Sequence, residues 1–582
     1  MIMWKKYSFV FWICGAILWS SCASANDFPE GRKTKALQLE TDKACYAPGE
    51  VVTIKMNEMT NGQAFVRYRH LDKVLAEEPI NNAMWTWTPP TTDYKGYMIE
   101  VYEKQAGEET SLGSIAVDVS SDWKKFPRYG FLSHYSNVTD NQIQRNIAKL
   151  NRHHINGVQY QDWHYKHHQP MAGAITAPAK EWLDIANRKV ERSIVDKYIS
   201  ETHRYGMKSI FYNLCFGVLK DAEQDGVNAS WFLYKDNNKK ERDKHPLPSD
   251  WKSDIFLVNP GDADWQAYLA KENTKVYRNF DFDGYQIDQL GSRGNVYDAQ
   301  GSKVDLPSGY LSFIQTMKQA HPDKRLVMNA VSGFGQEQIA KGDVDFYYNE
   351  VWGEEAKYAD LSRIVEKNSQ LNEKLSTVFA AYMNYNMADR QGYFNTPGIL
   401  LTDAVIFAFG ASHLELGEHM LGKEYFPNNN LKMKTDLETA LIHYYDFLVG
   451  YQNLLRDGGT FNEVEISSND SKINTSNWPP KYQHVAVVGK QQAKRQIIHL
   501  LNFSQALHLD WRDIDGNQPE PTCIEKAAMT LKTSIPVEKL WVASPDFNRG
   551  VPQTIEFKQH TSEISFVLPQ LKYWDMIVVE YK

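Results

Sequence analysis

The chain has 582 residues with a formal net charge of −8 at pH 7, and it is 42% hydrophobic and 23% charged. This is the composition of an ordinary globular protein, and the length is too great for one core, so we expect roughly two to four domains. The sequence has neither a basic stripe nor an excess of positive charge, so nucleic acid is not an expected partner. The 16 Trp and 32 Tyr suit the flat apolar faces of sugars, although a tyrosine-rich core accounts for them equally well.

Residues 1–25 have the pattern of an export signal. Lys5 and Lys6 precede an apolar run, Phe9 to Trp19, that is too short to cross a bilayer as a helix. Cleavage after Ala25 would release the mature chain. Alternatively, the stretch that ends at Cys22 resembles a bacterial lipobox, although a Trp stands where that motif usually has Leu, and Cys22 would then carry a lipid. Both alternatives predict export, either as a secreted protein or as a cell-surface or periplasmic lipoprotein whose only membrane contact is Cys22.

Residues 26–122 predict an immunoglobulin-like β-sandwich, because short alternating strands are separated by turn signals. No chemistry is evident in this segment, which we interpret as a structural module. The expected strands are Ala36–Glu40, Val51–Met56, Ala64–Tyr68, Met84–Trp87, Gly96–Tyr102 and Ser114–Val119.

Residues 123–457 predict a (β/α)8 TIM barrel, because apolar strands alternate with long helical stretches. A doubly wound sheet would need fewer strands and usually a glycine-rich phosphate turn, which the sequence lacks. The expected strands are Tyr129–Ser136, Ile155–Trp163, Met207–Phe216, Phe282–Asp288, Arg325–Ala330, Asp345–Glu350, Thr377–Asn384 and Ala411–Leu416. The expected helices include Asp140–Asn151, Ser193–Tyr205, Asp264–Arg278, Tyr310–Ala320 and Asp360–Leu371, followed by a long helical segment, Leu431–Leu454.

Residues 458–582 return to short strands and predict a C-terminal antiparallel β-sandwich. Three cysteines follow the signal, namely Cys45, Cys215 and Cys523. They are far apart and odd in number, so we expect buried thiols rather than a disulfide framework. The histidines of the stretch His164–His168 have no partner carboxylate at a defined spacing, so we expect neither a metal ion nor another cofactor.

Polar side chains end the predicted barrel strands, and in barrels of this type the active site lies at those ends. No Ser or Cys stands in a nucleophile turn, so carboxylates, amides and aromatic rings point to polyol chemistry. The candidate substrate-binding residues are His134, Gln159, Asp162, Trp163, Asn329, Trp352, Tyr382, Asn384 and Glu415.

Asp288 and Glu350 end the fourth and sixth predicted strands and form the candidate catalytic pair. Glycoside hydrolysis needs one ionised and one protonated carboxyl group across the scissile bond. Glu350 lies among Tyr347, Tyr348 and Trp352, and aromatic walls that exclude water raise a carboxyl pKa, so Glu350 is the better acid. Alternate strands lie about 10 Å apart, and inward-leaning side chains would reduce the separation to roughly 5–5.5 Å. Each acid alone could instead be a helix cap or a loop ion pair.

Four stretches together resemble glycoside hydrolase family 66, which contains endo-dextranases and cycloisomaltooligosaccharide glucanotransferases. They are INGVQYQDWHYKHH (155–168), FDGYQIDQLG (282–291), YYNEVW (347–352) and HLELGEHML (413–421). The resemblance implies a retaining mechanism on α-1,6-linked glucan. Asp288 would be the nucleophile, Glu350 the acid/base, and Asp162 a carboxylate that holds the sugar at the cleavage subsite.

The resemblance extends over the whole exported chain and favours an endo-dextranase acting on dextran and isomalto-oligosaccharides. The glucanotransferases of the family typically carry a carbohydrate-binding module inserted in the barrel, and the region between Glu350 and Glu415 has no room for one. Two alternatives stay open. One is a transferase or a hydrolase of another α-glucan on the same scaffold, and the other is a non-catalytic glycan-binding protein of the cell surface.

Overall fold

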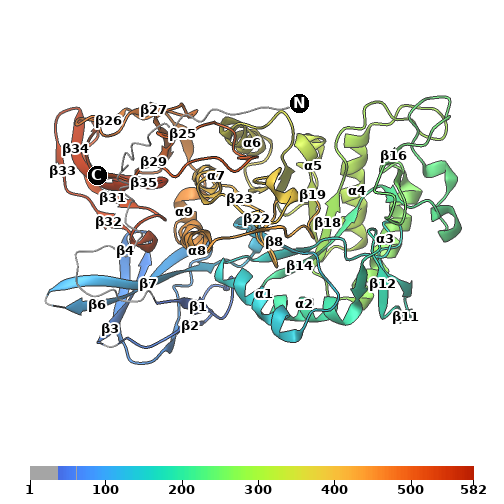
Figure 1. Ribbon diagram of the computed structural model, residues 1–582, viewed down its shortest axis with the longest axis horizontal. Helices are drawn as coiled ribbons and strands as arrows, with labels where there is room; N and C mark the ends of the chain where they lie inside the picture. The colour runs from blue at the N-terminus through green and yellow to red at the C-terminus, as the bar shows by residue number, and fades with distance from the viewer. Residues whose placement is uncertain (1–36, 61, 106) are drawn as a thin grey trace, which may run out of the picture.

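The computed structural model describes residues 37–60, 62–105 and 107–582, and it contains three sheet assemblies in chain order (Figure 1). The predicted signal peptide and Cys22 lie outside the described residues. Within those residues, helices long and apolar enough to cross a bilayer are absent. Cys215 is buried, whereas Cys45 and Cys523 are partly exposed, which corrects the expectation of three buried thiols.

The central assembly is an eight-stranded parallel sheet whose strands pair in chain order, so all eight predicted strands are confirmed. The strands are shorter than predicted: β8 (Tyr129–Leu132), β9 (Gly157–Tyr160), β14 (Lys208–Leu214), β18 (Gly284–Asp288), β19 (Arg325–Asn329), β20 (Tyr347–Glu350), β21 (Thr377–Ala380) and β23 (Ser412–His413). The amide of Phe131 on β8 donates to the carbonyl of Leu416 just beyond β23, at 3.1 Å. This contact nearly closes the sheet into a barrel.

One helix follows each barrel strand, which is the arrangement that parallel neighbours require. The helices are α1 (Asp140–Arg152), α2 (Arg192–Arg204), α3 (Ala263–Asn279), α4 (Leu306–Ala320), the single turn α5 (Gln336–Ile339), α6 (Tyr358–Leu371), α7 (Thr396–Ala408) and α8 (Thr435–Gly450), with α9 (Gln452–Leu455) following α8. Thr139 caps α1 in a reciprocal capping box with Gln142. Helix α7 is buried on every side, so its sequence has no amphipathic period.

The N-terminal assembly consists of two antiparallel sheets that enclose an apolar core. One contains β1 (Leu39–Thr41), β2 (Val52–Met56) and β5 (Met84–Trp87), and the other contains β4 (Lys73–Ile80), β3 (Ala64–His70), β6 (Lys95–Gln105) and β7 (Glu108–Val119). The transition to the barrel falls between Val119 and Tyr129.

The C-terminal assembly also has two sheets around its own core, but it is not wholly antiparallel, because β27 pairs with β28 in parallel. The larger sheet contains β25 (Thr460–Asn462), β27 (Thr475–Asn477), β28 (Val485–Gln492), β29 (Arg495–Asn502), β35 (Trp574–Tyr581), β31 (Val537–Ala543) and β32 (Gln553–Thr554). The smaller contains β26 (Ile466–Ser468), β30 (Ile524–Lys532), β34 (Glu563–Leu571) and β33 (Phe557–Gln559).

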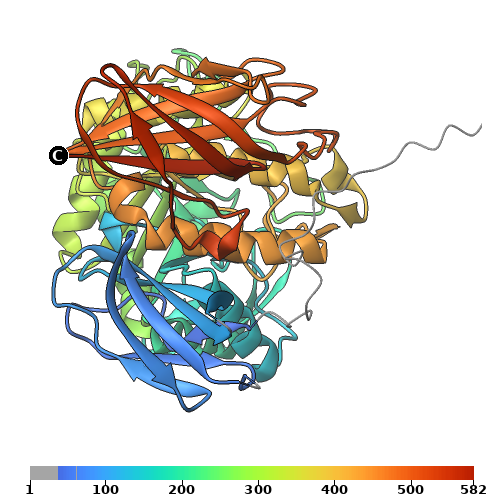
Figure 2. The same ribbon diagram turned by 90° about the vertical axis from the view of Figure 1, so that its left-hand side faces the viewer.

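Helix α8 lies between the N-terminal and C-terminal sheets, as Figure 2 shows for the orange helix between the blue and red strands. Strand β6 approaches α8 so closely that a Cβ atom at Gly96 would lie 2.0 Å from the carbonyl oxygen of Val449. Glycine is therefore required at that point of the strand. Most of β6 and the second half of β7 are buried on both faces, because the sandwich core covers one face and α8 covers the other.

Asp446 on α8 is the polar centre of this contact. Its buried carboxylate accepts hydrogen bonds from Arg152 at 2.8 and 3.0 Å, from His154 at 2.7 Å and from the amide of Ala116 on β7 at 2.9 Å. Burial alone would raise the pKa of Asp446, but the Arg152 guanidinium and the hydrogen bond from His154 reverse this and hold the pKa well below its usual value. Asp446 is therefore ionised and stabilising at neutral pH, and that contribution is lost only as the pH falls through the lowered pKa.

We expect Asp446→Ala to destabilise the protein by about 3–5 kcal/mol, because it leaves the largely buried Arg152 charge and the buried His154 ring without their partner. Thermal unfolding followed by circular dichroism would measure the loss as a lower midpoint. Asp436→Ala, at an exposed position of the same helix, is the matched control. Equal midpoints for the two variants would contradict this role for Asp446.

Candidate active site

Alternating residues of the barrel strands point inward, and this alternation builds the site. The buried cluster inside the barrel includes Tyr129, Ile210, Val327 and Tyr348 from four strands, and Leu414 directly after β23. Two positions further along their strands, Ile210 is followed by Tyr212, Val327 by Asn329 and Tyr348 by Glu350. The polar side chains at the mouth therefore continue the apolar rows of the core.

A cavity of about 330 Å³ lies at the C-terminal ends of the strands. Its walls combine carboxyl, amide and aromatic side chains, as a sugar site requires. The lining residues are Gln159, Gln161, Tyr212, His245, Gln286, Asp288, Gln289, Leu290, Asn329, Val331, Tyr348, Glu350, Trp352, Tyr382, Glu424 and Phe426. A larger, more open hollow of about 640 Å³ lies on the C-terminal sandwich, but its walls contain a single carboxyl group, Glu556, so we place the chemistry in the barrel.

Asn329 joins the two candidate catalytic carboxyl groups. Its amide nitrogen donates to Asp288 Oδ1 at 2.8 Å and to Glu350 Oε2 at 2.9 Å. Each carboxyl group also accepts a bond from a tyrosine hydroxyl at 2.7 Å, Asp288 from Tyr212 and Glu350 from Tyr382. All four oxygens of the pair are therefore fixed by side chains of the barrel.

The surroundings of Glu350 and Asp288 affect the pKa values of the two carboxyl groups differently. Burial, reinforced by the nearby charge of Asp288, raises the pKa of Glu350 to about 7. Burial also raises the pKa of Asp288, but hydrogen bonds from Asn329 and Tyr212 oppose the shift by stabilising the carboxylate. Two adjacent carboxyl groups do not both ionise readily, and the environment favours Glu350 over Asp288 as the protonated member, because both burial and the Asp288 charge oppose ionisation of Glu350.

Six of the residues selected from the sequence line the cavity. They are Gln159, Asp288, Asn329, Glu350, Trp352 and Tyr382. Four of them lie on strands, and Tyr382 lies two residues after β21. Trp352 lies two residues beyond Glu350, with its ring 5.3 Å from that of Tyr382.

Asp162 and His134 lie beside the cavity rather than in its wall. Asp162 adopts a left-handed conformation (φ 50°), and its carboxylate lies 3.9 Å from the Arg188 guanidinium. Burial raises the pKa of Asp162 to about 7, and Asp288 is among the charges that add to the shift. His134 donates to Glu418 at 2.7 Å, at the seam between the first and last strands of the barrel.

Three selected residues point away from the cavity, and for these the prediction of substrate contact is wrong. Trp163 is fully buried between the barrel and its helices, because the left-handed turn at Asp162 breaks the alternation that placed Gln159 and Gln161 inward. Asn384 is fully buried and donates to the carbonyl of Asp513 at 2.6 Å, so it ties the barrel to the C-terminal segment.

Glu415 is the third of these residues. It lies two residues after His413, the last residue of β23, whose ring contacts Asp403 on α7, and it accepts a bond from Tyr445 on α8 at 3.0 Å. The inward neighbour is Leu414. Burial next to Asp403 raises the pKa of Glu415 well above its usual value, so Glu415 belongs to a buried proton-sharing network outside the barrel.

Several residues that form or support the cavity are not among the candidate site residues chosen from the sequence. Tyr212, Gln286 and Tyr348 lie within their strands rather than at the ends. Counting back by two from Asp288 and Glu350 would have found Gln286 and Tyr348, whereas Tyr212 precedes an apolar end residue, Leu214. Arg512 comes from the C-terminal assembly, donates to the carbonyl of Val351 at 2.6 Å and lies 5.2 Å from the Trp352 ring, so it supports a wall of the cavity. No motif or periodicity near Arg512 in the sequence predicts that contact.

The chain matches a known protein family along most of its length. The sequence profile described as Glycosyl hydrolase family 66 matches residues 41–578. The chain belongs to glycosyl hydrolase family 66. The resemblance predicted from the four motifs is therefore confirmed.

Individual members of the family resemble the chain along most of its length. A cycloisomaltooligosaccharide glucanotransferase of Niallia circulans is 25% identical over 708 aligned residues, covering 93% of this chain and 72% of the relative. A dextranase of Streptococcus salivarius is 21% identical and covers 84% of this chain and 68% of the relative. The crystal structure of a Paenibacillus glucanotransferase complexed with cycloisomaltoheptaose has a TM-score of 0.85 at 23% identity, covering 94% of this chain and 99% of that one, so the two share a fold.

We expect Tyr382→Phe to shift the alkaline limb of glycoside turnover to higher pH. The Tyr382 hydroxyl stabilises the charged form of Glu350, so its removal raises the Glu350 pKa above about 7 and the proton is retained to higher pH. The pH dependence of kcat/KM would measure the shift. Tyr393→Phe, at an exposed site, is the control. An alkaline limb that moved to lower pH would contradict the assignment.

Proposed function

We propose that the protein hydrolyses α-1,6-glucosidic linkages within dextran, with retention of configuration and through a covalent glycosyl-enzyme. The observation that carries the proposal is the pair of cavity carboxyl groups, Asp288 and Glu350, joined by one amide nitrogen of Asn329. Because that nitrogen reaches both groups, the two bonded oxygens lie no further apart than the sum of the two distances, about 5.7 Å. Retaining glycosidases have carboxyl separations of roughly 5–5.5 Å, and inverting ones have roughly 6.5–9.5 Å.

In this mechanism Asp288 attacks the anomeric carbon while Glu350 protonates the leaving glycosidic oxygen. The glucosyl unit is then esterified to Asp288, and the shortened glucan departs as the free alcohol. Glu350, now ionised, takes a proton from water, and the water oxygen displaces Asp288 from the anomeric carbon. The cycle returns one proton to Glu350 and leaves Asp288 ionised. Tyr212 and Asn329 orient the attacking carboxylate, and Tyr382 orients the acid.

The substrate assignment rests on the family and on the cavity walls. The similar proteins are named for dextran or for cyclic isomalto-oligosaccharides. The aromatic rings of Trp352, Tyr348 and Tyr382 offer faces for pyranose rings, and Gln159 and Gln286 offer amides for hydroxyl groups. Asp162, beside Arg188, remains our candidate for holding the sugar at the cleavage subsite.

A glucanotransferase is the second candidate, because relatives with that name match at 25% and 24% identity. A sugar hydroxyl would then replace water as acceptor. The alignment with the first of them spans 708 residues and is longer than this 582-residue chain, so that relative contains residues without a counterpart here. This favours hydrolysis, because the family's transferases are expected to carry an inserted sugar-binding module. The paired carboxyl groups argue against a non-catalytic binding protein.

Two alanine variants separate the roles of the carboxyl groups. We expect Asp288→Ala to lose nearly all turnover of every substrate, because no covalent ester forms. Glu350→Ala should lose about 10²–10⁴-fold on dextran but much less on a 4-nitrophenyl isomaltoside, whose leaving group needs no proton. Initial rates on both substrates would measure this, with Glu354→Ala, an exposed residue near the mouth, as control. Near-normal dextran turnover by either variant would contradict the assignment.

Products identify both the stereochemistry and the reaction. Proton NMR during dextran cleavage should record the α-anomer first, and the β-anomer should appear only through mutarotation. Chromatography should reveal a ladder of linear isomalto-oligosaccharides and no release from starch or pullulan. Cyclic products would assign the transferase reaction, and a first β-anomer would rule out retention.

A further inference from the structure

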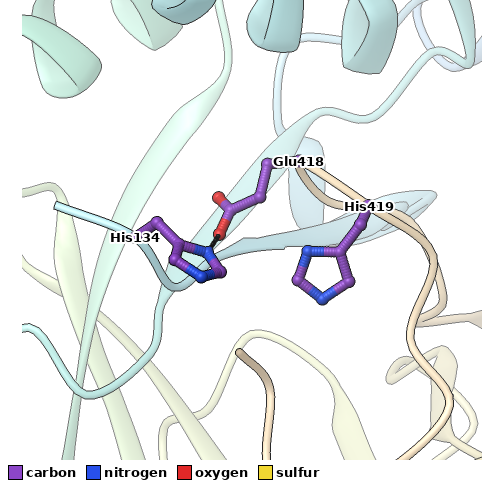
Figure 3. Close-up of side chains that lie close together, drawn as sticks. All are labelled: His134, Glu418 and His419. Atoms are coloured by element: carbon purple, nitrogen blue, oxygen red, sulfur yellow. Dashed lines mark hydrogen bonds and ion pairs between the residues drawn. The ribbon is translucent and has the colours of Figure 1, made fainter. Parts of the chain in front are cut away.

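Three side chains with metal-binding groups meet at the seam where the barrel closes (Figure 3). His134 follows the first barrel strand, and Glu418 and His419 follow the last. One nitrogen of each histidine and one oxygen of the glutamate lie within 4.8 Å of one another. The cluster adjoins the cavity but contributes no side chain to its wall, and the mechanism proposed above does not use it.

His419 is held as a ligand would be. Its Nε2–H donates to the carbonyl oxygen of Phe426 at 2.7 Å, which leaves Nδ1 with a bare lone pair. Nδ1 is buried and has no hydrogen-bond partner among the described residues, and the side chain is 9% exposed. The ring is fixed further by its edge-to-face contact with Phe131. Figure 3 shows it turned toward the other two side chains.

Glu418 also has one unused atom. Its Oε1 accepts bonds from the Ser133 amide at 2.9 Å, from the Ser133 hydroxyl at 2.7 Å and from His134 Nδ1 at 2.7 Å. These donors anchor an ionised carboxylate. Its Oε2 is buried and has no partner among the described residues. Glu418 Oε2 and His419 Nδ1 are thus two buried polar atoms without partners in one cluster, which is unfavourable unless something binds them.

His134 completes the set as its adjustable member. The ring is 42% exposed, so it can turn without disturbing the core. In a tetrahedral zinc site with bonds of about 2.0–2.2 Å, neighbouring ligand atoms lie roughly 3.3–3.5 Å apart. The ligand atoms of the cluster lie within 4.8 Å of one another, and rotation of His134 would adjust the position of its nitrogen to this range.

Two other groups of this kind within the described residues are already filled. In the first, Lys166 bonds Asp221 at 2.7 Å and Asp225 at 2.5 Å beside His168, so an ammonium takes the place of a cation. In the second, both ring nitrogens of His413 are bonded, to Asp403 and to the carbonyl of Ala381, and the group is sealed between α7 and the barrel.

We propose that His134, Glu418 and His419 bind one divalent transition-metal ion of the zinc class at the barrel seam, with a coordination position left for solvent. Two imidazoles and one carboxylate suit Zn²⁺, Co²⁺ or Ni²⁺, whereas Ca²⁺ and Mg²⁺ prefer sites made of oxygen. The second shell is already present, because Phe426 and Ser133 orient two of the ligands.

The test is metal binding by the full chain, independent of its activity. After treatment with a chelator and desalting, the protein would be titrated with ZnCl₂ by calorimetry, and with CoCl₂ while the visible spectrum is recorded. We expect one ion per chain and the strong visible absorption of four-coordinate Co²⁺. His419→Gln and Glu418→Gln should each weaken Zn²⁺ binding at least about tenfold, since losing a ligand exceeds the effect of losing an outer-shell partner.

Control variants make the result specific. His134→Gln changes a half-exposed ring, so it should fold normally and still weaken binding even if the buried variants prove unstable. Asp221→Asn, in the Lys166 group, and His484→Gln, at a partly exposed site on the C-terminal assembly, should bind as the unaltered protein does. Absence of stoichiometric Zn²⁺ binding by the unaltered protein would overturn the proposal. So would binding that survives all three cluster variants, or that is lost in Asp221→Asn.

Discussion

The two hydrogen bonds from the Asn329 amide to Asp288 and Glu350 are the interaction on which the site depends. Their geometry requires three neighbouring strands to be in one register, with Ile287 beside Met328 and Asn329 beside Tyr348. A shift of one residue in any of them would turn its polar end residue out of the barrel. The register is held by the apolar rows beneath the mouth, where Val327 and Tyr348 are packed in the interior. The same strand register is therefore required both by the packing of the core and by the geometry of the two carboxyl groups.

Burial gives this pair its chemistry. The same exclusion of water that raises the pKa of Glu350 also raises that of Asp288, and the difference between them comes from hydrogen bonds and from the charge of the partner. Part of the structure that excludes water from the carboxyl pair lies outside the barrel. The segment that carries Arg512 and Asp513 extends from the C-terminal sandwich and contacts Val351 and Asn384, so the distant assembly closes a wall of the cavity.

Much of this arrangement was predictable from the sequence. Eight apolar strands, each followed by a helix, indicated the barrel, and a carboxylate at the end of an apolar strand indicated Asp288 and Glu350. The errors arose where a strand ended earlier than its hydrophobicity suggested. β9 ends at Tyr160 and β21 at Ala380, so Trp163 and Asn384 lie in turns whose side chains no longer alternate between the two faces. The cluster of His134, Glu418 and His419 was equally unpredictable, because His134 is 284 residues from Glu418 along the chain and they meet only where the barrel closes.

By itself the sequence determined the order of the three assemblies, the barrel and the identity of the two central acids, because these follow from local periodicity and from residue type. The tertiary structure alone decided which polar residues face the cavity, which tyrosines and amides hold the acids, and that α8 and Asp446 bind the N-terminal sheet to the barrel. The reason is physical. Periodicity is a property of neighbours in the chain, whereas hydrogen bonds, burial and pKa depend on residues that only the closed barrel brings together.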